Sequence, residues 1–142
     1  MQSRRLNSLS IEGFRAFKSL RIERFADVNL IVGKNNSGKT TLLEALRLYF
    51  LQGDRYRITE LLLSREEYSF QKQGNLSESG LPPLAYEALF YGRPKFLETK
   101  PSFRIGPLAP NADNAVLDVD FTWLREVQEE DGTIRFLSLI PT

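Results

Sequence analysis

Residues 33–41 read Gly-Lys-Asn-Asn-Ser-Gly-Lys-Thr-Thr, and they are the most informative segment of the chain. Gly33, Gly38, Lys39 and Thr40 fill every fixed position of the pattern G-x-x-x-x-G-K-[ST]. A loop that winds into the start of a helix aims successive backbone N–H groups at one point, where a chain of phosphates can accept them. The pattern therefore predicts a phosphate-binding loop for a nucleoside triphosphate.

Each position of this loop has an expected task. The two glycines permit the tight path of the loop, and Lys39 is expected to reach the β- and γ-phosphates of ATP as a charged donor. The Thr40 hydroxyl would complete the coordination of a Mg²⁺ ion shared with the nucleotide, and Thr41 starts the helix. The predicted nucleotide-binding residues are Gly33, Lys34, Asn35, Asn36, Ser37, Gly38, Lys39, Thr40 and Thr41.

The flanking sequence supports this prediction over a chance match of a Gly/Asn-rich turn. Residues 28–32 form a short, mostly apolar and β-branched run, which predicts a buried strand before the loop. Residues 41–52 predict an amphipathic helix after the loop, with Gly53 as its stop. The apolar face of this helix comprises Leu42, Leu43, Ala45, Leu46, Tyr49 and Phe50.

The composition is that of an ordinary globular domain and limits the available chemistry. With 142 residues, of which 42% are hydrophobic and 26% charged, the chain can bury a core. A net charge of +1 provides no bulk attraction to nucleic acid. The chain has no cysteine and no histidine, which excludes disulfides, thiolate metal sites and the usual general base. No apolar run approaches the roughly 20 residues of a membrane-spanning helix. We expect a cytoplasmic protein that does not contact membrane.

Two alternating segments, 9–14 and 20–25, predict antiparallel strands ahead of the loop. After the first helix, Thr59 is predicted to cap a short helix that carries Leu61, Leu62 and Leu63. Residues 71–79 are polar and predict a loop, and Pro82 and Pro83 are predicted to open a helix that continues to about residue 91.

The last third of the chain predicts a β-hairpin. Residues 115–124 alternate strictly, Asp131 and Gly132 form a turn signal, and residues 133–140 run back as the second strand. Residues 101–114 are predicted to be an irregular connection. The expected core face of the first strand comprises Leu117, Val119, Phe121 and Trp123.

The first part of the chain has the order Leu9-x-Ile11-x-Gly13-Phe14-Arg15-x-Phe17, followed by a strand and then by residues 33–46. This order resembles the start of the ABC-type ATPase heads of the SMC, RecF and OLD-nuclease group, and most closely the OLD-like AAA ATPases. The strong part of the resemblance covers about the first 50 residues. It implies an α/β P-loop NTPase fold, with a mixed sheet, an antiparallel β lobe and flanking helices. It also implies ATP and Mg²⁺ as ligands, a homodimer of heads and a role with DNA. By the same resemblance, Arg15 and Lys18 lie near the nucleotide.

Three parts that such a head needs are absent from this sequence: an LSGG-like signature, an apolar strand that ends in Asp-Glu, and a switch histidine. Gln71 or Gln73 falls in the region of the Q-loop. We therefore expect no catalytic residue in this chain. The expectation is one partial ATP-binding domain, 1–142, divided into strands, loop and helix (1–53), a helical insert (54–100) and the hairpin (101–142). The chain ends just after the apolar strand predicted at 133–140, and this favours the interpretation as a partial domain.

The leading hypothesis is a nucleotide-binding piece of an ATPase head that acts in DNA repair, DNA processing or defence against phage, with hydrolysis dependent on a missing C-terminal half. One alternative is a complete small P-loop kinase in which Asp118 or Asp120 holds Mg²⁺, although alternating strands usually place such aspartates on a solvated face. Another is a non-catalytic interaction module. Phe14 and Phe17 could stack on an adenine ring, but aromatic residues at this spacing more often belong to the core.

Overall fold

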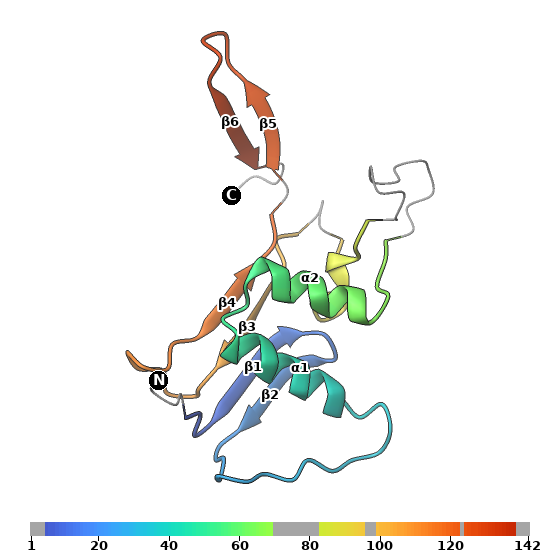
Figure 1. The fold of residues 1–142 in the computed structure, drawn as a ribbon, viewed down its shortest axis with the longest axis vertical. Helices are drawn as coiled ribbons and strands as arrows, with labels where there is room; N and C mark the ends of the chain where they lie inside the picture. The colour runs from blue at the N-terminus through green and yellow to red at the C-terminus, as the bar shows by residue number, and fades with distance from the viewer. Residues whose placement is uncertain (1–4, 70–82, 96–98, 123, 139–142) are drawn as a thin grey trace.

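The computed structural model describes residues 5–69, 83–95, 99–122 and 124–138. Four antiparallel strands form a sheet in the order β2-β1-β3-β4. These strands are β1 (Leu9–Phe14), β2 (Phe17–Ile22), β3 (Ser102–Gly106) and β4 (Leu117–Asp120). Two helices, α1 (Lys39–Phe50) and α2 (Arg55–Ser64), cross one face of this sheet (Figure 1). The other described elements are a 3₁₀ turn, η1 (Tyr86–Leu89), and a hairpin of β5 (Leu124–Gln128) and β6 (Ile134–Ser138), which projects away from the sheet.

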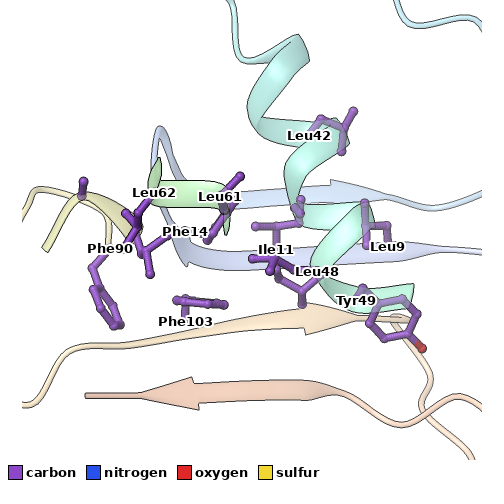
Figure 2. Close-up of a cluster of buried hydrophobic side chains, with 14 of the residues drawn as sticks. Leu9, Ile11, Phe14, Leu42, Leu48, Tyr49, Leu61, Leu62, Phe90 and Phe103 are labelled. Carbon is purple, nitrogen blue, oxygen red and sulfur yellow. The ribbon is translucent and has the colours of Figure 1, made fainter. Parts of the chain in front are cut away.

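The core lies between the two helices and the central strands β1 and β3 (Figure 2). Alternate residues of these strands, among them Leu9, Ile11 and Phe103, are fully buried. The rings of Phe14 and Phe103 meet edge to face, with centroids 4.9 Å apart. α1 supplies Leu42, Ala45, Leu48 and Tyr49 to the same core, so the helix packs against the sheet along its length.

The prediction of two antiparallel strands at the start of the chain is confirmed by β1 and β2. The second strand begins three residues earlier than predicted, because Phe14 pairs directly with Phe17 across a two-residue turn. The helix predicted over 41–52 is also confirmed, as α1, but it begins at Lys39 rather than at Thr41 and ends at Phe50, two residues earlier at each end.

The buried strand predicted at 28–32 is wrong for this structure. Residues 28–32 form no strand, and the side chains of Val28, Leu30 and Val32 are 77–88% exposed. In Figure 1 the segment between β2 and α1 is a long loop that swings away from the sheet. A strand needs a neighbour for its backbone hydrogen bonds, and within the described residues none pairs with this segment. The predicted mixed sheet is wrong for the same reason, since every strand pair described is antiparallel.

The last third contains a hairpin, but its strands differ from the prediction. The turn at Asp131 and Gly132 is confirmed, and it joins β5 to β6. The strand predicted at 115–124 is divided, because β4 pairs with β3 and only Leu124 belongs to the hairpin. The irregular connection predicted at 101–114 contains β3, the buried strand that pairs with β1 and β4. Leu117, Val119 and Phe121 pack against the core as predicted.

The helix predicted from Pro82 to about residue 91 is reduced to the single turn η1. The polar loop at 71–79, with Gln71 and Gln73, lies outside the described residues, as do Pro82 and Trp123. Among the helices of the described ranges, none has the length and apolarity needed to cross a bilayer.

The helix that carries Leu61–63 begins four residues before Thr59, so the predicted cap is also wrong. Asp54 is the N-cap, and its carboxylate accepts a hydrogen bond of 2.9 Å from the backbone N–H of Arg57. Thr59 lies inside α2, where its hydroxyl donates to the carbonyl of Arg55. α2 is tied to α1 by an ion pair between Arg47 and Glu60, and the hydrogen bond from Arg57 with the charge of Arg47 lowers the pKa of Glu60.

We expect Asp54→Ala to lower the free energy of unfolding by about 1 kcal/mol, since it leaves an N-terminal amide of α2 without its acceptor. Thr59→Ala should change it by less than about 0.5 kcal/mol, because the Thr59 hydroxyl satisfies no group that the helix leaves unpaired. Chemical denaturation of the two variants measures the difference. Equal effects would show that Asp54 is not the cap.

Candidate phosphate-binding site

The loop predicted to bind phosphate is a tight turn that runs directly into α1. Asn36 and Gly38 both adopt left-handed backbone conformations, with φ of +64° and +94°. The Ser37 N–H donates to the Lys34 carbonyl at 3.2 Å, and the Leu42 N–H donates to the Gly38 carbonyl at 2.8 Å as the helix begins. The loop is therefore curled, and the first amides of α1 follow from it without a break.

Both glycines of the motif lie where a side chain would collide. A Cβ atom at Gly33 would lie 2.6 Å from the Ser37 hydroxyl, and one at Gly38 would lie 2.8 Å from the ring of Phe17. Gly38 also has a positive φ, which L side chains rarely adopt. Gly38 is therefore required by both its backbone conformation and the Phe17 ring, whereas a side chain at Gly33 would require the Ser37 hydroxyl to move.

The Lys39 side chain folds back over the loop. Its ammonium group donates hydrogen bonds to the carbonyls of Gly33 and, at 3.3 Å, Lys34. Gly38 supplies no side-chain cap to α1, and the first turn of α1 has no acidic residue. The start of α1 therefore combines uncapped amides with one ammonium group, and this donor set fits a polyphosphate.

Magnesium fits this site only together with a nucleotide. Within the described residues no group of three or more carboxylate, histidine or cysteine side chains converges to hold a metal. Thr40 is exposed at the helix start and offers one hydroxyl. Because Mg²⁺ keeps an octahedral set of oxygens, phosphate and water would have to supply the other ligands.

Arg15 is buried beside the start of α1 and is held by two carboxylates. Its guanidinium donates to both oxygens of Glu67 at 2.7 and 2.8 Å, and its Nε lies 3.1 Å from a Glu44 oxygen. The exposed fractions of these side chains are 6% for Arg15, 11% for Glu44 and 13% for Glu67. Contact between Arg15 and a nucleotide stays a prediction, and it would require donors that these carboxylates now occupy. Lys18 lies exposed on the edge strand β2.

A pocket of about 330 Å³ opens next to this cluster and reaches the helix that follows the loop. Its lining includes Arg15, Thr41, Arg65, Glu67 and Arg93. Arg65 binds the remaining oxygen of Glu44 at 2.6 Å, so the charges alternate from Arg65 through Glu44 and Arg15 to Glu67. Sequence reasoning missed this network, because Arg15 and Glu67 are 52 positions apart and no local pattern links them.

The prediction that Asp118 and Asp120 face solvent is confirmed. Both are exposed, and Asp118 pairs with Arg104 at 3.2 Å. They lie on β4, at the edge of the sheet opposite to β2, whereas the loop touches Phe17 of β2. Phe14 is a core residue, as the more frequent outcome predicted.

The sequence of this chain is similar to a protein family and to several known proteins. Residues 5–118 match the family described as AAA ATPase domain. The chain is 30% identical over 138 residues to an ATP/GTP phosphatase of Helicobacter pylori, which covers 96% of this chain and 32% of that protein. It is 34% identical over 82 residues to the DNA replication and repair protein RecF of Rickettsia prowazekii, covering 56% of this chain and 23% of that protein. The chain thus spans about a third or less of the length of these relatives. No solved structure gives a significant match.

Proposed function

This chain belongs to the AAA ATPase domain family, and from that premise we propose that it binds ATP with Mg²⁺ through residues 33–41. The observation that carries the proposal is the convergence of the uncapped amides of α1 and the Lys39 ammonium group on one curled loop. On binding, Lys39 exchanges its bonds to the Gly33 and Lys34 carbonyls for bonds to phosphate oxygens. The Thr40 hydroxyl joins the ligands of the Mg²⁺ ion, which the triphosphate brings with it.

We also propose that the chain is the N-terminal portion of an ABC-type head like those of SMC, RecF and OLD-like proteins, and that hydrolysis needs residues beyond these 142. Two observations support this. The Helicobacter pylori relative is about three times as long as this chain, and Val28, Leu30 and Val32 expose apolar side chains just before the loop. Parallel strands from a further segment would cover this run and make it the buried strand that its composition favours. The glutamate that positions water for hydrolysis would come from the same segment.

The wider role is proposed from the relatives. Since two matched proteins are named for replication, repair or nucleotide phosphatase activity, we propose that the whole protein is a dimeric, cytoplasmic ATPase that acts in DNA repair, DNA processing or defence against phage. The kinase alternative is less favoured, because Asp118 and Asp120 lie at the far edge of the sheet from the loop.

Adding ATP with Mg²⁺ should raise the melting temperature of the purified chain, because a ligand that binds only the folded state stabilises it, by about 2.7 kcal/mol at a hundred times the dissociation constant. Release of phosphate should stay at the level of the buffer blank. Thermal melts and a phosphate-release assay measure the two. An absent shift would favour the non-catalytic module, and phosphoryl transfer by the chain alone would favour the kinase.

A further inference from the structure

The contact between Phe17 and Gly38 joins the loop to the sheet. A Cβ atom built on Gly38 would lie 2.8 Å from Cζ and 2.9 Å from Cε1 of Phe17, so the edge of the ring rests directly on the Gly38 backbone. Phe17 is the first residue of β2 and pairs with Phe14, whose side chain is fully buried. The ring is thus attached to the turn between β1 and β2, next to a core residue.

Before Gly38 the loop has few other supports: Ile31 packs against the core and Asp27 pairs with Arg5. From Ala26 to Ser37 every residue except Ile31 is exposed, and residues 28–32 pair with no strand in the described part of the chain. The contact of Gly33 with Ser37 and the bonds of Lys39 to Gly33 and Lys34 lie within the loop itself. They give the loop its shape but do not fix it relative to the sheet.

From these contacts we propose, on the basis of the function proposed above, that Phe17 is a positioning residue for the phosphate site. Its ring holds Gly38 in the left-handed conformation that turns the chain into α1. The direction of the Lys39 and Thr40 amides follows from that turn, because Gly38 is the N-cap residue of the helix. Phe17 therefore acts on the phosphates through the backbone, not by stacking on the base.

Two ligands, ATP and inorganic tripolyphosphate, distinguish a positioning role of Phe17 from a stacking role. Inorganic tripolyphosphate carries the same phosphate chain as ATP but no base. If loss of the ring leaves the loop in its binding conformation only about a tenth of the time, the apparent dissociation constant rises about tenfold for either ligand. A residue that stacks on adenine would affect ATP alone.

The experiment compares Phe17→Ala, Phe17→Leu and Leu20→Ala with the unaltered chain, by calorimetry with ATP and with tripolyphosphate in the presence of Mg²⁺. Leu20 is the matched control, since it is a partly buried apolar residue of the same strand that packs on the core. We expect Phe17→Ala to weaken both ligands about tenfold, Phe17→Leu to restore part of the affinity, and Leu20→Ala to leave both unchanged. Weakening of ATP alone, or of neither ligand, would overturn the proposal.

A measurement without ligand separates this proposal from the proposed function. Hydrogen exchange at the amides of Ser37 and Leu42 reports the loop turn and the first bond of α1. In Phe17→Ala these amides should exchange about tenfold faster than in Leu20→Ala at equal global stability. Unchanged exchange would refute the positioning role even if ATP binds. Faster exchange in a chain that binds no ATP would support the role and reject the proposed function.

Discussion

Replacing Lys39 with alanine should raise the dissociation constant for ATP with Mg²⁺ by about 30- to 150-fold. The Lys39 ammonium group donates hydrogen bonds to the Gly33 and Lys34 carbonyls of the loop. It therefore lies within the loop that is proposed to bind the phosphates. A hydrogen bond to a charged partner contributes about 2 to 3 kcal/mol, and each 1.4 kcal/mol corresponds to a factor of ten. Isothermal calorimetry at fixed salt measures the change.

The control is Arg24→Ala, which removes the same charge from an exposed residue outside the loop. It should shift the dissociation constant by less than about threefold, because exposed charges at a distance are screened by salt. Melting curves without nucleotide show whether Lys39→Ala also loosens the loop, since Lys39 bonds to Gly33 and Lys34. If Lys39→Ala and Arg24→Ala bind ATP equally well, residues 33–41 are not the nucleotide site.

The features predicted correctly from sequence depend on neighbours along the chain. The loop and α1 follow from the glycine positions and the helical spacing after Lys39, and both signals lie within 20 residues. The β1–β2 pair needs only a two-residue turn. The β5–β6 turn is likewise carried by Asp131 and Gly132, a strong turn signal at any position in a chain.

The features that were missed depend on distant partners. Residues 28–32 have a strand-like composition, yet a strand forms only beside another strand, and the described chain offers none. β3 is short and is flanked by Pro101 and Pro107, so its local sequence favours a connection. Only its place between β1 and β4 makes it a buried strand. The N-cap of α2 is Asp54, a residue type that favours this position, whereas the prediction placed the cap at Thr59, close to the apolar run at Leu61.

The candidate site shows the same division between features set by neighbouring residues and features set by distant ones. The spacing of residues 33–41 predicts a nucleotide site, and that role stays a prediction, whereas no local pattern indicates the contact of the Phe17 ring with Gly38 or the carboxylates around Arg15. Both contacts join segments that are distant in sequence, and a single sequence does not indicate which distant charged or aromatic residues are in contact.

The second large effect is expected in stability. Arg15→Ala should lower the free energy of unfolding by about 3 kcal/mol, because it leaves the buried Glu67 carboxylate with only Arg93, 3.9 Å away, while Glu44 keeps its pair with Arg65. This loss is a large fraction of the 5 to 15 kcal/mol that holds a typical domain together. Urea denaturation followed by circular dichroism measures it, and a chain that fails to fold would show a larger loss.

Arg57→Ala is the matched control, because it breaks an ion pair with Glu60 whose partners are 43% and 47% exposed. Solvent screens an exposed pair, so its loss should change the stability little, and the difference between the two variants isolates the effect of burial. Arg15→Lys should keep part of the stability, since it retains the charge but loses the two-pronged contact with Glu67. Adding Glu67→Gln to Arg15→Ala should recover part of the loss by removing one unpaired charge. If Arg15→Ala costs no more than Arg57→Ala, Arg15 does not neutralise buried carboxylates, and its guanidinium is free for the nucleotide contact that the family resemblance predicts.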